Sequence, residues 1–255
     1  MIKFFRNIRK NLLNKGKTSK YLKYAIGEIV LVVIGILIAL AINKWNQKIQ
    51  ESKQGKVLLE RIHHDLVQDT LLFRKTVEKN VVIREDIKHF LNTMYSGVEN
   101  KKQVEKMSAT FDKALDQIFS YNKTTYNSIM STGSINLINN PKLKDDILEL
   151  YNSYEEIEEL LNSINEWMLN VTSTLDTKTN FIKFNTQVSD IYTYKEMITE
   201  KDFEFLNNQS SEEFQILVRA ISATAFNQKV RNMYYQDLIK KCHTTLQHIN
   251  IELEK

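Results

Sequence analysis

An uninterrupted apolar run near the N-terminus constrains this chain more than any other feature. Residues 29–42 are fourteen consecutive residues without a polar side chain, and eleven of them are Ile, Val or Leu. Extended to Tyr24 and Trp45, with Glu28 as its one acid, the segment has 22 residues. A helix of that length is about 33 Å long, close to the thickness of the hydrocarbon core of a bilayer. We therefore predict a transmembrane helix over residues 21–46, with a buried core helix as the alternative.

Five residues of the predicted span indicate how it is anchored. Tyr24 and Trp45 flank the run, at depths where aromatic side chains favour the membrane interface. Glu28 lies near one end, where it is either interfacial or a functional ionisable group. Gly35 and Ala39 are four residues apart, a spacing of small residues that lets two helices approach closely. We expect these five residues to form the anchor, and the last two to favour a homo-oligomer.

The charge of the chain is distributed unevenly. Residues 1–24 contain eight Lys or Arg and no acid, whereas the remainder has 27 basic and 31 acidic residues. Because positively charged flanks stay in the cytoplasm, we predict a cytoplasmic N-terminus and an extracytoplasmic domain over residues 47–255. The basic excess is confined to this arm, which argues against a nucleic-acid partner. A cleaved signal peptide is the competing interpretation, because residues 39–41 (Ala-Leu-Ala) have the small-x-small form of a cleavage site.

The arm itself, residues 1–20, is amphipathic. Apolar residues occupy one half of a helical wheel over positions 2–13 and basic or polar residues the other half. Such a helix can lie on an anionic membrane surface, so the lipid bilayer is its expected partner. The residues expected at the lipid surface are Lys3, Arg6, Arg9 and Lys10. A disordered basic tail that only fixes the topology is the alternative.

The remaining chain has the composition and periodicity of helices. Six Gly and one Pro in 255 residues leave too few turn residues for a barrel or a doubly wound sheet. Apolar residues recur every three or four positions, which predicts an all-α fold with long helices over about 45–95, 101–120, 141–183 and 211–250. Residues 184–210 are expected to form a loop with short helical turns. Four such helices suggest an elongated antiparallel bundle resembling a four-helix bundle.

A search for chemical motifs is mostly negative. His63 and His64 are adjacent, so on a helix they point about 100° apart and cannot easily share a metal ion. Cys242 falls on an apolar stripe and is expected to be a small core residue. Residues 131–134 (Ser-Thr-Gly-Ser) indicate a helix break rather than a nucleophile turn. We therefore predict no catalytic residue, no metal site and no cofactor.

Two stretches resemble a family of uncharacterised single-pass proteins found mainly in Bacteroidota. The first runs from Phe4-Phe5-Arg6 through the apolar run to Asn43-Lys44-Trp45-Asn46, and the second comprises Thr125, Ser131-Thr132-Gly133 and Asn140-Pro141. The resemblance implies an anchor in the inner membrane of a bacterium and a helical domain in the periplasm. It implies no activity, cofactor or catalytic residue. This chain departs from many members in having Ala41 where they have a polar residue.

Two hypotheses for the function follow. The first is a non-enzymatic, membrane-anchored helical module that acts as a scaffold, subunit or sensor through contacts with an unknown protein partner. The second is a membrane-anchored hydrolase or metal-dependent enzyme. The first is favoured, because the sequence contains a span and long helices but no recognised catalytic motif.

Overall fold

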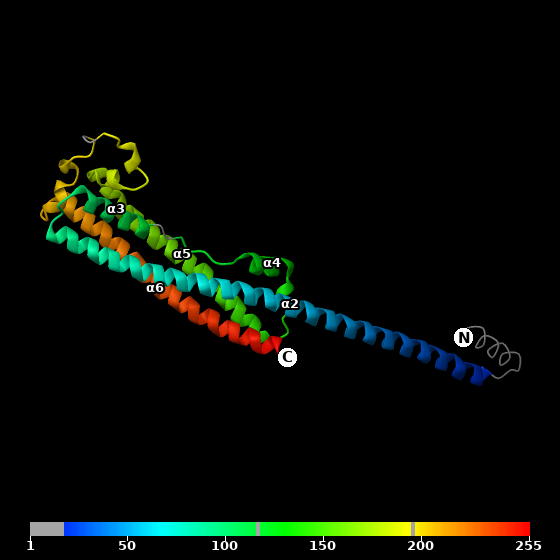
Figure 1. Ribbon diagram of the computed structural model, residues 1–255. Coiled ribbons are helices and arrows are strands. Elements are labelled where there is room, and N and C mark those ends of the chain that lie inside the picture. Colours follow the sequence, from blue (N-terminus) through cyan, green and yellow to red (C-terminus); the bar gives the residue numbers. More distant parts are fainter. Residues whose placement is uncertain (1–17, 116–117, 195–196) are drawn as a thin grey trace. The chain divides into compact units, whose positions relative to one another are not determined.

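Helices account for all the regular structure in the part of the chain that is described. The computed structural model describes residues 18–115, 118–194 and 197–255, and no strand occurs among them (Figure 1). The α-helices are α2 (Thr18–Ser96), α3 (Lys101–Leu115), α4 (Thr124–Thr132), α5 (Pro141–Lys178) and α6 (Glu212–Leu253). Short 3-10 turns are η1 (Ser134–Leu137), η2 (Phe181–Phe184), η3 (Ser189–Ile191), η5 (Glu200–Asp202) and η6 (Glu204–Asn207). The predicted all-α class is confirmed.

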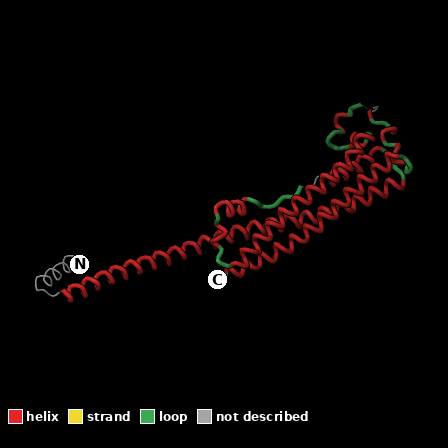
Figure 2. Tube along the Cα trace, turned by 180° about the vertical axis from the view of Figure 1, so that it is seen from behind, coloured by secondary structure: helices red, strands yellow, loops and turns green. Residues whose placement is uncertain are grey.

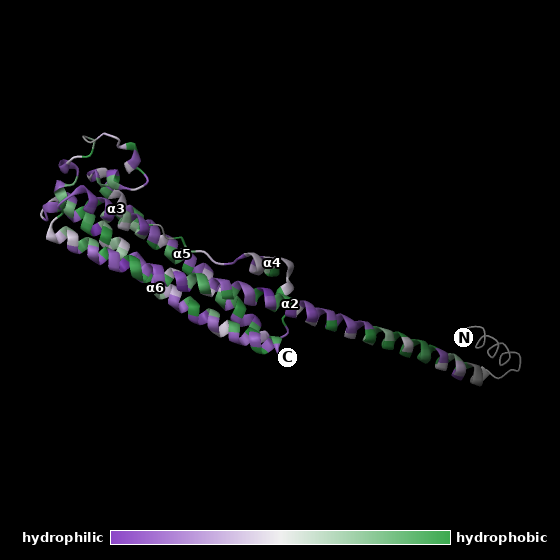
Figure 3. Cartoon of the chain, viewed as in Figure 1, coloured by the Kyte–Doolittle hydropathy of each residue, from purple (hydrophilic) through white to green (hydrophobic). Residues whose placement is uncertain are grey.

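The chain divides into two compact units, residues 1–57 and residues 58–255. In the first unit, no side chain between residues 22 and 50 is buried. Hydrophobic residues follow one another along this part of α2 (Figure 3). Their large side chains are exposed. All the buried apolar residues in the described part of the chain belong to the second unit.

Local signals explain where the long helices begin. The Asn140 side chain accepts a hydrogen bond from the Leu143 N–H, and proline occupies the first turn of α5. At the start of α6, the Ser211 side chain accepts from the Phe214 N–H, and two glutamates lie in the first turn. Both starts agree with the sequence prediction. Gly133 ends α4 with a φ of 68°, the left-handed conformation in which glycine carries no steric cost.

Two helices end earlier than predicted. The described part of α3 ends at Leu115 and residues 118–120 are not helical, whereas the apolar spacing predicts a helix to about 120. α5 ends at Lys178 rather than near 183. After α5 the backbone is extended at Thr179, and the chain then forms η2. Phe181 and Phe184 are both buried there. The apolar spacing beyond Lys178 therefore reflects side chains that reach the core from a 3-10 turn, not from a longer helix.

The second unit contains two hydrophobic clusters, and α2, α5 and α6 run side by side through it (Figures 1 and 2). The first core takes its α2 residues from Leu58–Phe73 and its α6 residues from Tyr235–Ile249. The second core takes its α2 residues from Ile83–Met94 and its α6 residues from Phe214–Ile221. On both helices the two cores are separated by a stretch with buried polar side chains, which positions the site described next.

Candidate functional site

One segment of the described residues is long and apolar enough to cross a membrane. It lies in α2, within Leu22–Ser96, where an 18-residue window has a mean hydropathy of 2.9 and 0% of the window is buried. A core helix of a soluble protein would bury most of such a window, and this one buries none of it. A signal sequence near the N-terminus would have the same composition. The protein therefore has one candidate membrane span.

The predicted anchor residues lie on an open helix surface. Tyr24 is 57% exposed and Trp45 is 67% exposed. Ala39 is exposed, and Glu28 is partly buried. A Cβ added at Gly35 would meet no atom within 4 Å, so this face leaves room for a second helix. The predicted lipid-surface residues Lys3, Arg6, Arg9 and Lys10 lie outside the described residues.

Between the two cores lies a set of buried polar side chains, here called the polar layer. Its members come from α2 and α6: Asn80, Thr224, Asn227, Gln228, Arg231 and Asn232. The Asn80 amide donates to the Asn232 side-chain oxygen at 2.9 Å, which joins the two helices. The Gln228 amide donates to the Ala114 carbonyl at 3.1 Å, which joins α6 to α3. These two hydrogen bonds therefore link α2 and α3 to α6 through side chains.

Arg231 is the charged member of the polar layer and is only 1% exposed. Its Nε donates to Asn227 Oδ1 at 3.0 Å, and its Nη2 donates to the Leu161 carbonyl at 3.5 Å. Among the described residues no carboxylate forms an ion pair with it, and its Nη1 has no hydrogen-bond partner. Burial lowers the pKa of the guanidinium, and Tyr235 opposes that effect. A buried charge without a counter-ion costs stability, so the polar layer lowers the stability of the second unit.

A second buried polar group lies inside the first core. Asp69 is fully buried, and its Oδ1 accepts from the Asn122 N–H at 2.9 Å and from the Asn122 amide at 2.7 Å. Within the described residues its Oδ2 has no hydrogen-bond partner. Burial raises the pKa of Asp69 to about 6, although the two Asn122 hydrogen bonds lower it in part. The carboxylate ties the segment before α4 to α2.

The Tyr154 hydroxyl and Cys242 Sγ form a neighbouring buried contact, 2.8 Å apart. Burial raises the pKa of the Cys242 thiol to about 11. A thiol that is fully buried and protonated is a poor nucleophile. The prediction that Cys242 is a core residue is confirmed.

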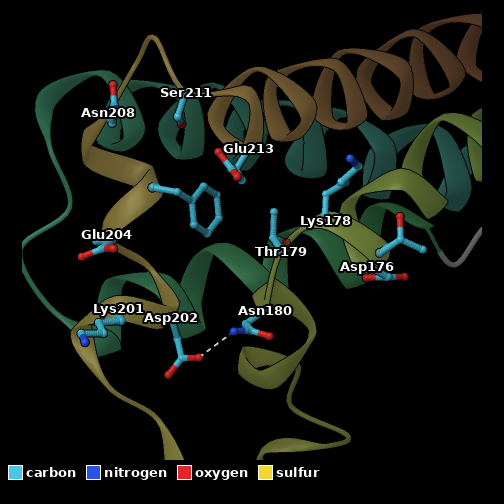
Figure 4. Close-up of a pocket in the computed structure, with 12 residues that line it drawn as sticks. Asp176, Lys178, Thr179, Asn180, Lys201, Asp202, Glu204, Asn208, Ser211 and Glu213 are labelled. Atoms are coloured by element: carbon cyan, nitrogen blue, oxygen red, sulfur yellow. Dashed lines mark hydrogen bonds between the residues drawn. The ribbon is translucent and has the colours of Figure 1, made fainter.

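An open depression lies between the C-terminal end of α5 and the segment that leads into α6 (Figure 4). Its volume is about 690 Å³, and acidic and basic side chains both line it. Asp202 accepts from Asn180 at 2.9 Å and from Lys183 at 2.7 Å. Burial alone would raise the pKa of Asp202, but Lys183 and the Thr199 N–H hold it below the usual value. Since its carboxylates and ammonium groups carry opposite charges, the depression favours no single class of ligand.

The histidines are dispersed. His63 is partly buried and His64 is exposed. His248 Nδ1 lies 2.6 Å from Asp146 Oδ2 and so connects α6 to α5. Within the described ranges, no group of three or more His, Cys, Asp or Glu residues is arranged to hold a metal ion.

Sequence reasoning missed Asp69 and Arg231, although the pattern contained a signal for both. Asp69 continues the stripe of Ile62 and Leu66 at a spacing of three, and Phe73 follows four residues later. Arg231 precedes Tyr235 on the buried stripe of α6 by four residues. A charged residue at a stripe position is the signal that would have identified each of them.

Comparison with known proteins gives one match. The model of a family of unknown function, DUF6090, matches residues 28–210. The chain belongs to this family. No curated protein and no solved structure matches it. The family match includes Asp69 and α5, whereas α6 with Arg231 and Cys242 lies beyond it.

Proposed function

We propose that this protein is a membrane-anchored, non-enzymatic helical module that acts as a scaffold, subunit or sensor through protein contacts. The exposed apolar window of α2 is the observation that carries the proposal. The eleven Ile, Val and Leu residues of the run would contribute roughly −3 to −6 kcal/mol to insertion into a bilayer. In water the same side chains would stay exposed, and this free energy would not be gained. A bilayer is therefore the environment that favours this segment.

The proposed topology is a single span with the N-terminus in the cytoplasm. Eight basic residues precede the run, and short basic flanks remain on the cytoplasmic side. Residues 47–255 would then lie in the periplasm, next to a bacterial inner membrane. There the long helices offer extended surfaces, and large side chains such as Trp167 and Phe226 are about half exposed. Contact with other proteins is the function that such surfaces support.

Membrane extraction tests the anchor. The full chain should stay with the membrane pellet after alkaline carbonate washing, and its mass should be that of the intact polypeptide. A variant with Val33→Arg and Leu37→Arg should be released, since each arginine costs about 2.5–3.5 kcal/mol at the centre of a span. The matched control, Val81→Arg and Val82→Arg, changes two exposed residues outside the apolar run and should remain in the pellet. A wild-type mass that begins at Ile42 would show a cleaved signal peptide and would overturn the anchor.

Topology and partners need separate measurements. Protease added to intact spheroplasts should digest the region after residue 47 and spare a tag on the N-terminus. A photo-crosslinking residue at an exposed α5 or α6 position should then capture a protein in the native membrane. Capture of nothing from any exposed position would contradict a role in protein contacts.

A further inference from the structure

Four large side chains form an exposed apolar patch where α5 and α6 meet, here called the seam patch. Its residues are Leu160 and Trp167 of α5 and Phe226 and Met233 of α6, which are 38%, 47%, 52% and 56% exposed. The rings of Trp167 and Phe226 contact edge to face, with centroids 5.6 Å apart. The residues are seven apart on each helix, so two turns separate the upper and lower pairs.

The seam patch has two levels, each with one residue from α5 and one from α6, because the two helices are antiparallel. Asp146 near the start of α5 contacts His248 near the end of α6, and Lys178 at the end of α5 pairs with Glu212 at the start of α6. Leu160 therefore lies level with Met233, as Trp167 does with Phe226. At these exposures the patch presents on the order of 400 Å² of apolar surface, a size that marks interaction sites on soluble domains.

The two helices on either side of the seam patch carry opposite charge. Residues 145–177 of α5 contain nine acids and no Lys or Arg, whereas residues 214–251 of α6 contain five Lys or Arg and one acid. Several of these charged residues are exposed: Glu155, Glu156, Glu159 and Glu166 on α5, and Arg219, Lys229 and Lys240 on α6. Among the described residues none of these seven side chains forms an ion pair. The face is thus an apolar strip between exposed acids of α5 and exposed bases of α6 that form no ion pair among the described residues.

Such a face is complementary to a second copy of itself. A two-fold axis parallel to the helices places α5 of one copy over α6 of the other, so that acids face bases. A two-fold axis across the helices would place α5 over α5, so that acids face acids. In the first arrangement Glu166 and the partner's Lys229 differ in height along the helix axis by less than about 5 Å. The same holds for Glu156 and the partner's Lys240.

We propose that two copies of this chain pair in parallel through the α5–α6 face, with the seam patch as the apolar centre of the interface. A standard interface buries about 800 Å² per partner, and the seam patch supplies about half of that area. The flanking charges select the parallel arrangement. This inference rests on the proposed function, because it names a second copy of the chain as one of the protein partners.

The oligomeric state of the full chain tests the proposal. In detergent micelles or lipid nanodiscs the wild type should have the mass of a dimer, and Phe226→Glu should raise the dissociation constant at least tenfold. Val82→Glu, at a residue that is 61% exposed on α2 and outside the face, should leave the dimer intact. A dimer that is lost in Gly35→Leu but kept in Phe226→Glu would instead place the contact between the spans and would overturn the proposal. A monomeric wild type, or a dimer unaffected by Phe226→Glu, would overturn the proposal.

Exchanging two opposite charges shows whether a weakened dimer results from lost contacts or from misfolding. Glu166→Lys and Lys229→Glu should each weaken the dimer, because each places like charges opposite one another. The double variant should restore dimerisation. Additive weakening in the double variant would contradict the parallel pairing.

Cysteine crosslinking distinguishes the two possible axes. A chain with Leu160→Cys mixed with a chain with Met233→Cys should form a disulfide between copies, because the parallel arrangement places α5 of one copy over α6 of the other and these two positions are level. Mixing Leu160→Cys with Trp167→Cys should give no crosslink between positions 160 and 167, since seven residues span about 10 Å and a disulfide needs Cα atoms within about 7 Å. Wild type is the background control, because Cys242 is fully buried. Preferential linkage of 160 to 167 would refute the arrangement, and a failed anchor or topology test would refute the proposed function instead.

Discussion

Replacing Asp69 by asparagine should stabilise the fold at neutral pH much more than at acidic pH. Asp69 is fully buried, and burial raises its pKa from 3.8 to about 6. The folded state therefore binds a proton more tightly than the unfolded state does. The contribution of Asp69 to the free energy of unfolding is greatest below about pH 4. It falls as the pH rises through about 6 and is constant at higher pH.

The size of the effect follows from the pKa difference. At 1.36 kcal/mol per pKa unit, the ionised Asp69 costs the folded state about 3 kcal/mol at neutral pH. Between pH 4 and 7.5 the loss amounts to between about 2 and 3 kcal/mol, because part of the unfolded population is already ionised at pH 4. Asparagine keeps an oxygen that can accept from Asn122 but carries no charge. Any cost of burying its amide is independent of pH and cancels in the comparison.

Thermal unfolding of the micelle-solubilised full chain, followed by circular dichroism, measures this difference. For about 200 residues, 1 kcal/mol corresponds to roughly 2–4 °C in Tm. The rise in Tm caused by Asp69→Asn should thus be about 5–10 °C larger at pH 7.5 than at pH 4. Asp86→Asn removes the same charge from a partly exposed site on α2 and serves as the matched control. An equal change in Tm at both pH values for Asp69→Asn would refute the reasoning.

Three further outcomes are expected. Cys242 should resist a thiol reagent such as iodoacetamide in the native protein and react completely after denaturation, because it is fully buried and burial raises its thiol pKa to about 11; rapid native labelling would show that the first core opens. Asn140→Ala should lower the stability by about 1 kcal/mol through the loss of the N-cap hydrogen bond to Leu143, whereas Asn140→Ser should keep most of it, as judged by Tm. Gly133→Ala should cost about 1–2 kcal/mol because the residue has a φ of 68°, and an unchanged Tm would mean that α4 ends differently in solution.

Local sequence signals predicted the helices well because each depends on neighbouring residues. The starts of α5 and α6 follow from caps within three residues of the first turn, such as Asn140 and Ser211. The apolar run predicted a transmembrane helix over residues 21–46, and the structure has there a helix long and apolar enough to cross a membrane. Both types of signal act over one or a few helical turns, which is the range that a sequence pattern can represent.

The ends of helices depended on more distant contacts. The end of α5 at Lys178 is an example, since the apolar spacing continues through Phe181 and Phe184 into a 3-10 turn. Both rings reach the second core from that turn. Periodicity detects which residues are buried, but it does not show whether a helix or a turn carries them.

The sequence by itself determined an all-helical chain with an apolar segment, since composition and short-range periodicity dictate both. Only the tertiary structure showed that Asp69 and Arg231 are buried and that neither forms an ion pair with another described residue, because burial depends on which helices lie against a stripe. The same holds for the seam patch, whose α5 members are more than 50 residues away in the chain from its α6 members. They meet only through the antiparallel packing of α5 and α6. Packing between distant segments decides which polar side chains are removed from water and which apolar side chains stay exposed to it. The buried polar side chains lower the stability of the fold, and the exposed apolar side chains form the proposed contact.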